Sequence, residues 1–330
     1  MSAVSTATIA DVRGLTVAYH SGDSWLQVVR DVSFQIRTGE ILAIVGETGS
    51  GKSTTASAMI RMLPRNGRVV SGSVRFAGED LLGLSDRAMR RLRGQDIAYV
   101  PQQPMSAFNP TMTVGRQVAE PLVIHRSLSY RAAAPKAAQR LREMGIHEVD
   151  RVMRSYPHEL SGGMLQRAMI ASAMICQPRL LIADEPTSAL DVTIQRQILE
   201  LIKQVQIEYQ LAVVLISHDL AVVSHVADRI LVLYGGRAAE IGPTASMVNA
   251  PRHPYTRGLL RSTLTAELGH KAKLASLAGY PPNPLEVDRE PGCPFRPRCH
   301  RAETECSVAF PPLEGQPSHQ WACYNPEPTA

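Results

Sequence analysis

The sequence predicts an α/β fold built around a phosphate-binding loop, and three observations lead to this prediction. Short apolar runs, which are typical of buried strands, recur at 41–45, 180–183 and 212–216. A glycine-rich stretch follows the first of these runs and precedes a segment with helical periodicity. Helical segments also separate the later runs, as in sheets whose parallel strands are joined by helices.

Length and composition indicate a globular protein with a full hydrophobic core. The chain has 330 residues, 44% of them hydrophobic, which suits one large domain and an appendage. Its formal net charge of +5 comes from 35 basic and 30 acidic residues spread along the chain, so we expect no nucleic-acid partner. The apolar runs are far shorter than the roughly 18 residues of a membrane helix, and no signal segment is apparent at the N-terminus. We therefore expect a cytoplasmic protein.

An antiparallel hairpin is predicted at 9–36, where apolar and polar residues alternate around a polar turn at 21–24. Tyr19 comes at the end of its first strand. An aromatic ring there suits stacking on an adenine, and it equally suits simple packing at a strand end.

The glycine-rich stretch fits the pattern G-x-x-x-x-G-K-[ST]. Its glycines let successive backbone N–H groups turn toward a triphosphate, and the helix expected at 53–63 directs its positive end at the same phosphates. Lys52 adds a full charge, and Ser53 would ligate Mg²⁺. The predicted nucleotide site comprises Gly46, Glu47, Thr48, Gly49, Ser50, Gly51, Lys52, Ser53 and Thr54.

Two glutamines follow a predicted strand at 97–100 and open a proline-containing loop. A glutamine amide at a strand end can hold Mg²⁺ or the attacking water, and the sequence leaves open whether Gln102 or Gln103 does so. From about 112 to 160 the periodicity is helical, with a break at 127–129, so we expect a helical subdomain inserted between core strands.

A second helix start with exposed backbone N–H groups is predicted at Ser161-Gly162-Gly163, where Ser161 is a suitable N-cap. Two carboxylates then end the run at 180–183. Because a carboxylate at the end of a buried strand is unfavourable unless it serves a cation, Asp184 is placed to hold Mg²⁺ through water and Glu185 to reach the attacking water. His218, just after the run at 212–216, suits contact with a γ-phosphate.

The order of these motifs resembles the ATP-binding-cassette (ABC) ATPases over roughly residues 9–245. The resemblance implies a P-loop NTPase (RecA-like) core with an antiparallel β subdomain and a helical subdomain at about 104–178. It also implies functions for individual positions: adenine stacking by Tyr19, sensing of Mg²⁺ and of a transmembrane partner by Gln102, a signature loop at Ser161, Gly162, Gly163 and Met164, Mg²⁺ support by Asp184, general-base action by Glu185 and γ-phosphate contact by His218. The family usually has glutamine where this chain has Met164, and a similar methionine occurs in peptide-importer ATPases.

Four of the five cysteines are crowded into the proline-rich C-terminal part of the chain, at Cys293, Cys299, Cys306 and Cys323. Their spacings match neither the short pairs of structural zinc sites nor ferredoxin patterns, so spacing alone does not choose a metal. A segment this small needs a crosslinker to become ordered, and nearby arginines (Arg296, Arg298 and Arg301) could offset an anionic cluster. Cys176 is expected to be a buried core residue.

The stretch from His253 to Arg257 and the Cys-Pro-Phe-x-Pro-Arg-Cys segment narrow the resemblance to ATPase subunits of dipeptide and oligopeptide importers. Resemblance to this subfamily implies a 4Fe-4S cluster on the four cysteines. Bound zinc and unmetallated cysteines are the alternatives. The resemblance also implies a nucleotide-binding domain at 1–250 and a Cys-rich C-terminal extension at 251–330.

We therefore expect an ATPase that powers uptake of peptides, using ATP and Mg²⁺. The implied partners are a second, related ATPase subunit, two membrane permease subunits and an extracytoplasmic substrate-binding protein, with the chain peripheral on the cytoplasmic face of the plasma membrane. One alternative is an importer ATPase for nickel or a metal chelate. Another is a soluble ABC ATPase acting on nucleic acid or ribosomes, although those usually have two cassettes or a long coiled-coil insertion.

Overall fold

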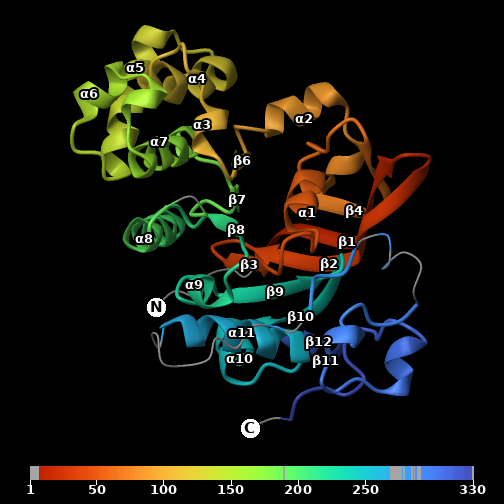
Figure 1. The fold of residues 1–330 in the computed structure, drawn as a ribbon. Coiled ribbons are helices and arrows are strands. Elements are labelled where there is room, and N and C mark those ends of the chain that lie inside the picture. The colour runs from red at the N-terminus through yellow and green to blue at the C-terminus, as the bar shows by residue number, and fades with distance from the viewer. Residues whose placement is uncertain are drawn as a thin grey trace. The chain divides into compact units, whose positions relative to one another are not determined.

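The computed structural model describes residues 7–188, 190–267, 277, 279–283, 285, 287 and 291–328, with the backbone alone at 263–267 (Figure 1). Contacts divide it into two compact units. The phosphate-loop unit comprises Thr8–Ile36, Ile41–Leu82 and the described residues from Ile216 onward, and the helical unit comprises Arg37–Glu40 and Gly83–Leu215. None of the described helices is long and apolar enough to cross a membrane.

An antiparallel sheet forms the N-terminal part of the phosphate-loop unit. The predicted hairpin is confirmed, because β1 (Thr8–Ser21) and β2 (Ser24–Arg37) are neighbours in this sheet. On its other side β1 pairs antiparallel with β4 (Gly67–Phe76), which is followed by β5 (Glu79–Asp80). The sheet thus provides the antiparallel β part that the sequence predicts.

A second set of strands in the same unit begins with β3 (Ile41–Val45), whose five residues are all buried. It pairs in parallel with β9 (Arg229–Tyr234), and β9 forms an antiparallel hairpin with β10 (Arg237–Pro243). The strand order continues through β12 (His319–Trp321) to β11 (Glu314–Gln316). The helices of this unit are α1 (Lys52–Met59), α9 (Leu220–Ser224), α10 (Thr244–Asn249) and α11 (Pro254–Glu267).

The helix after the phosphate loop is shorter than predicted. It ends at Met59 instead of residue 63, because Arg61 adopts a left-handed conformation (φ 52°) and Pro64 follows. Apolar residues beyond Met59 had extended the periodic pattern past this break.

The helical unit contains β6 (Ile97–Val100) and β7 (Leu180–Asp184), which pair in parallel, and the part of β8 (Ala212–Ser217) up to Leu215. All of the chain between β6 and β7 is described, and it is mainly helical, as predicted. The break expected at 127–129 is confirmed, since Ser127 is left-handed (φ 54°) and Ser129 caps the next helix. The helices here are α2 (Asp86–Leu92), α3 (Pro104–Ala107), α4 (Val114–Arg126), α5 (Tyr130–Glu143), α6 (Val149–Arg154), α7 (Gly162–Met174) and α8 (Val192–Tyr209).

A buried polar centre joins β10 to the start of α11. Glu240 is fully buried and accepts hydrogen bonds from the backbone N–H groups of Arg252 (2.7 Å) and His253 (2.9 Å) and contacts His319 Nε2 at 2.7 Å. His253 is 2% exposed, and its Nδ1 accepts from the N–H of Tyr255. Burial lowers the pKa of His253 to about 4, against an opposing effect of the Glu240 charge, so this imidazole is neutral at pH 7.

This buried imidazole makes stability depend on pH. In the unfolded chain His253 takes up a proton near its ordinary pKa of 6.5, whereas the folded protein resists protonation down to about pH 4. Stability is therefore lost as the pH falls through this window, by up to about 3 kcal/mol. In His253→Asn the amide oxygen can still accept a hydrogen bond from the Tyr255 N–H, but the side chain does not titrate. As the pH falls from 6.5 to 4, the midpoint of thermal unfolding should therefore fall less in this variant than in the wild type. Parallel curves for the two proteins would contradict this assignment.

Candidate active site

The phosphate loop follows β3 and requires glycine for steric reasons. A Cβ on Gly46 would lie 2.3 Å from the carbonyl oxygen of Leu233, and one on Gly51 would lie 2.8 Å from that of Val28. Gly51 also has φ 97° as the N-cap of α1. Because these positions admit no side chain, the backbone turns tightly and leaves the N-terminus of α1 to face a ligand.

Lys52 is buried and is held within its own loop. Its ammonium group donates to the carbonyl oxygens of Gly46 (2.8 Å) and Glu47 (3.0 Å). The hydroxyl of Ser50 is also buried and has no hydrogen-bond partner in the described part of the chain. A buried hydroxyl without a partner, next to a buried cation and a helix N-terminus, fits a site for phosphate groups.

Tyr19 has a packing role in the structure. Its hydroxyl is 3.3 Å from Thr54 Oγ1, and its ring lies so close to Gly67 that an added Cβ would meet the ring at 2.5 Å. The ring is therefore fixed beside the start of α1. Adenine stacking by Tyr19 remains a prediction.

The two carboxylates predicted at the end of β7 have separate partners within the helical unit. Asp184 is 5% exposed and accepts a hydrogen bond from the hydroxyl of Tyr99 (3.0 Å). Glu185 accepts from the side-chain amide of Gln102 (2.9 Å). Parallel pairing of β6 with β7 places Val100 beside Ala183, so Gln102, just past the end of β6, reaches Glu185. Gln103 instead occupies the N-cap position of α3, without a capping hydrogen bond from its side chain.

Glu185 has an unusual backbone conformation for a residue other than glycine. Its φ is 45°, in the left-handed region that costs a non-glycine residue roughly 1 kcal/mol or more. Strain of this kind persists where neighbouring structure holds it, and here β7 ends directly before it.

The predicted helix start at Ser161 is confirmed as an N-cap, since its hydroxyl accepts from the N–H of Met164 at 3.3 Å. Gly162 is exposed, and a Cβ on Gly163 would lie 2.9 Å from Ile194 of α8. The loop thus packs against α8 with its backbone accessible. Ala189 lies outside the described residues.

The predicted site residues are divided between the two units. The phosphate loop, Tyr19 and the exposed His218 belong to the phosphate-loop unit, whereas Gln102, Ser161, Asp184 and Glu185 belong to the helical unit. His218 follows β8, and the next residue, Asp219, caps α9. Each unit by itself thus presents its own part of the expected set.

Two residues near these groups were not predicted from sequence. Tyr99 donates a hydrogen bond to Asp184, and its hydroxyl-bearing side chain in an otherwise apolar strand is the sequence signal that could have identified it. From the sequence, Arg298 could offset the charge of an anionic cluster. In the structure it forms a two-point ion pair with Glu47 of the phosphate loop, with N–O distances of 2.6 and 3.0 Å.

The four C-terminal cysteines form no disulfide bonds with one another in the described residues. Burial, and then the charges of the other cysteines, raise the pKa of Cys293 to about 11 and that of Cys323 to about 12. The thiols therefore lie close enough to influence one another, and the N–H of Cys293 bonds to the carbonyl of Cys306. However, no three Cys, His, Asp or Glu side chains in the described ranges are arranged to hold a metal ion, so the predicted cluster is not confirmed. Cys176 is buried, as predicted.

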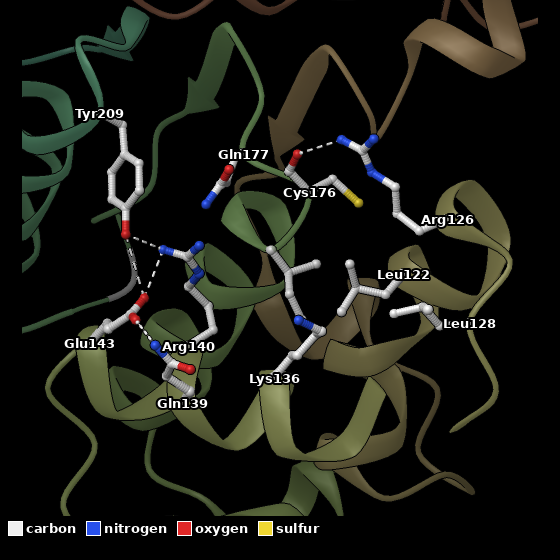
Figure 2. A pocket seen from close by; sticks show the side chains of 11 residues that line it. Leu122, Arg126, Leu128, Lys136, Gln139, Arg140, Glu143, Cys176, Gln177 and Tyr209 are labelled. Carbon is white, nitrogen blue, oxygen red and sulfur yellow. Dashed lines mark hydrogen bonds and ion pairs between the residues drawn. The ribbon is translucent and has the colours of Figure 1, made fainter. Parts of the chain in front are cut away.

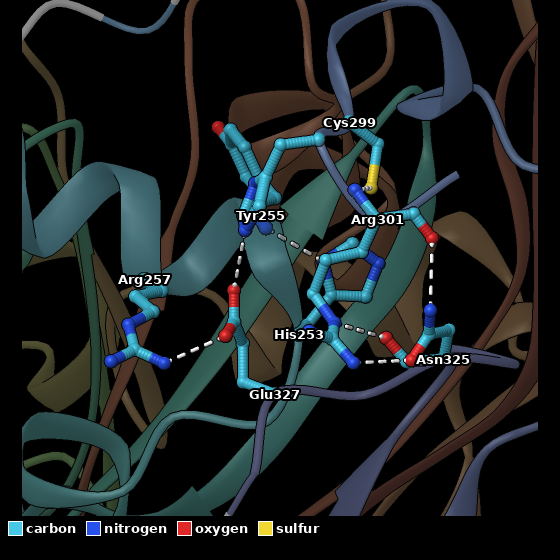
Figure 3. Close-up of polar contacts among 8 residues, drawn as sticks. His253, Tyr255, Arg257, Cys299, Arg301, Asn325 and Glu327 are labelled. Carbon is cyan, nitrogen blue, oxygen red and sulfur yellow. Dashed lines mark hydrogen bonds and ion pairs between the residues drawn. The ribbon is translucent and has the colours of Figure 1, made fainter.

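The end of the chain is fixed to α11 and to the cysteine segment by polar contacts (Figure 3). Arg257 pairs with the buried carboxylate of Glu327 at 2.6 Å. Arg301 donates from Nε to the carbonyl of Asn325 at 3.1 Å and from Nη2 to its side chain, and its own N–H points to Cys299 Sγ. These contacts order a segment that has few regular elements.

A cavity of about 690 Å³ lies in the helical unit, and none of the predicted nucleotide-site residues lines it. Figure 2 shows Arg140 directed at Tyr209 and Glu143, and Arg126 directed at the backbone carbonyl of Cys176. Since both guanidinium groups are already bonded to protein atoms, this cavity is a poorer candidate for a triphosphate than the phosphate loop.

Comparisons with protein families match two parts of this chain. Residues 29–188 match the model described as "ABC transporter", and residues 239–306 match "Oligopeptide/dipeptide transporter, C-terminal region". The second match includes Arg298 and three of the four cysteines.

Similar proteins cover almost the whole chain. The oligopeptide transport ATP-binding protein OppD of Escherichia coli (strain K12) is 41% identical over 99% of this chain and 98% of its own length. The dipeptide transport ATP-binding protein DppD of Bacillus subtilis (strain 168) is 45% identical over 92% of this chain and 90% of its own length. Among solved structures, the ATP-binding cassette MJ0796 bound to ADP and Pi has a TM-score of 0.64 at 27% identity, covering 71% of this chain and 98% of that one.

Proposed function

This chain belongs to the ABC transporter ATPases of the oligopeptide/dipeptide importer type, and from this premise we propose how its residues support ATP-driven uptake of peptides. It is an ATPase subunit of a peptide ABC importer. The observation that carries this conclusion is identity above 40% with peptide-transport ATP-binding proteins over nearly the full chain, including the C-terminal region.

We propose that the phosphate loop binds the triphosphate and that Lys52 stabilises charge on the γ-phosphoryl group. In the structure Lys52 bonds to two carbonyl oxygens of the loop, so phosphate oxygens would share or replace those partners. Ser53, Gln102 and Asp184 would hold Mg²⁺, which neutralises phosphate charge when bound. Gln102 suits this role because its NH₂ donates to Glu185, so the amide oxygen is oriented the other way.

Glu185 is the proposed general base. It would take a proton from the water that attacks the γ-phosphorus in line with the leaving oxygen. This proposal is supported by the different hydrogen-bond partners of the two acids. Gln102 orients the Glu185 carboxylate, whereas Tyr99 donates to Asp184, so Glu185 can act as the base while Asp184 supports Mg²⁺. His218 would contact the γ-phosphate, and Tyr19 would stack on adenine.

The assembled form is part of the proposal. ATP would be held between the phosphate loop of one subunit and the Ser161–Met164 signature loop of another. There it would contact the accessible backbone of Gly162 and Gly163. The second ATPase would be a related subunit, acting with two permease subunits and an extracytoplasmic substrate-binding protein. The chain would work peripherally at the cytoplasmic face of the membrane.

We also propose that Cys293, Cys299, Cys306 and Cys323 hold a 4Fe-4S cluster. Four thiols within electrostatic reach of one another support this, because thiolate sulfur is the usual ligand of such clusters. Zinc is the alternative, since it also accepts four thiolates.

The general base can be tested with Glu185→Gln in the assembled transporter. Loss of the proton acceptor should lower the ATPase rate by at least about 100-fold while ATP affinity stays near the wild-type value. Glu200→Gln is the matched control, because Glu200 is an exposed residue of α8 paired with Arg196. A normal rate in Glu185→Gln would contradict the assignment.

Cargo can be tested by reconstituting the chain with its permease and substrate-binding protein in proteoliposomes. We expect di- and oligopeptides to stimulate ATP hydrolysis and to accumulate inside, whereas nickel chelates should do neither. Stimulation by a nickel chelate alone would favour the alternative importer class. ATPase activity that responds to RNA or ribosomes, and not to a permease, would contradict the importer proposal.

The cluster can be tested on protein purified anaerobically under reducing conditions. We expect about four iron atoms per chain and broad visible absorption near about 400 nm, both lost in Cys306→Ser. Cys176→Ser is the control, since this buried thiol lies in the helical unit. Colourless protein with stoichiometric zinc would reverse the choice of metal.

A further inference from the structure

Glu47, the second residue of the phosphate loop, is held at each of its polar groups. Its N–H donates to the hydroxyl of Tyr255 (2.8 Å), and its carbonyl oxygen accepts from Lys52 (3.0 Å). Its carboxylate accepts two hydrogen bonds from Arg298, at 2.6 and 3.0 Å. Two of these three partners come from the C-terminal part of the chain, more than 200 positions away in sequence.

The Arg298 side chain is buried and makes several hydrogen bonds, although it lies in the C-terminal part of the chain. Its side chain is 6% exposed, and it donates to the Tyr234 hydroxyl (3.0 Å) as well as to both oxygens of Glu47. Hydrogen bonding to Glu47 raises the pKa of the guanidinium, which stays charged. A buried guanidinium needs its partners because an unpaired buried charge is strongly unfavourable. The two-point geometry also fixes the orientation of the carboxylate.

Tyr255 presents its hydroxyl from a rigid aromatic cluster. The ring is fully buried and packs against Tyr234 (centroids 4.4 Å apart) and Phe295 (5.3 Å). Phe295 and Arg298 both lie between Cys293 and Cys299, so the same short segment supports the ring and supplies the cation. The hydroxyl therefore has little freedom to leave the N–H of Glu47.

We propose that Arg298 and Tyr255 are positioning residues for ATP binding: they fix Glu47, and through its carbonyl oxygen the ammonium of Lys52, in the conformation that receives the triphosphate. The proposal rests on the ATPase function proposed above. The C-terminal segment thereby becomes a structural part of the nucleotide site. A purely stabilising ion pair would affect unfolding but not nucleotide affinity, and this difference makes the proposal testable.

The experiment measures the Kd of a fluorescent ATP analogue with Mg²⁺, and the KM and kcat for ATP, on the full chain and on the assembled transporter. Arg298→Met should raise Kd and KM about tenfold, the equivalent of about 1.4 kcal/mol, with a smaller change in kcat. Glu47→Gln should act in the same direction. Because the two side chains act as one unit, the double variant should bind no more weakly than the worse single variant.

The matched control is Arg257→Met. Arg257 also pairs with a glutamate at 2.6 Å in the C-terminal region, but that glutamate is Glu327 and not a loop residue. We expect it to lower the thermal midpoint without changing the Kd for ATP. Arg298→Lys, which keeps the charge and loses the two-point geometry, should recover part of the affinity.

Should Arg298→Met fold poorly, Tyr255→Phe removes only the hydroxyl and should raise Kd about fivefold, as expected for one lost hydrogen bond. An unchanged Kd in Tyr255→Phe or Arg298→Met would overturn the proposal. So would additive losses in the double variant, or equal loss in Arg257→Met. If the wild type itself binds no ATP, the proposed function fails; if the wild type binds and the variants bind equally well, only the positioning role fails.

Discussion

The close backbone approach at the turn after β3 is the constraint on which the rest of the structure depends. Gly46 leaves no room for a side chain against Leu233, so β9 must pass directly beside the loop. That contact aligns β3 with β9, and the hairpin from β9 to β10 then carries the chain to the polar centre at Glu240. A nucleotide site formed by backbone groups needs this rigidity, because its donors are fixed by main-chain geometry and not by adjustable side chains.

Much of the fold was predictable because it follows from local periodicity. The buried strand at 41–45, the hairpin at 9–36, the helix break at 127–129 and the cap at Ser161 depend on residues near one another in sequence, and the structure confirms them. The Gln102–Glu185 and Tyr99–Asp184 contacts depend on strand register, which a single sequence does not show. The pair between Arg298 and Glu47 joins residues 251 positions apart, and a charged residue carries no periodic signal of such a partner.

The cysteine segment shows how an apparent appendage can be integrated into a domain. Its composition, rich in proline and arginine, suggested a small element ordered by a metal. In the structure its arginines are engaged by protein groups, Arg298 by Glu47 and Arg301 by Asn325, and its Phe295 joins a buried aromatic cluster. Raised pKa values keep Cys293 and Cys323 protonated at neutral pH, so binding of any metal there would release protons.

The pairing of β12 with β10 has a consequence for folding of the chain during its synthesis on the ribosome. β10 is complete at Pro243, but its partner strand spans His319–Trp321, near the end of the chain. Until those residues emerge, the β10 edge lacks this neighbour and Glu240 lacks His319. An exposed strand edge invites pairing with other chains. Synthesis of the last residues thus closes the edge, and truncated products should be selectively lost to aggregation or proteolysis.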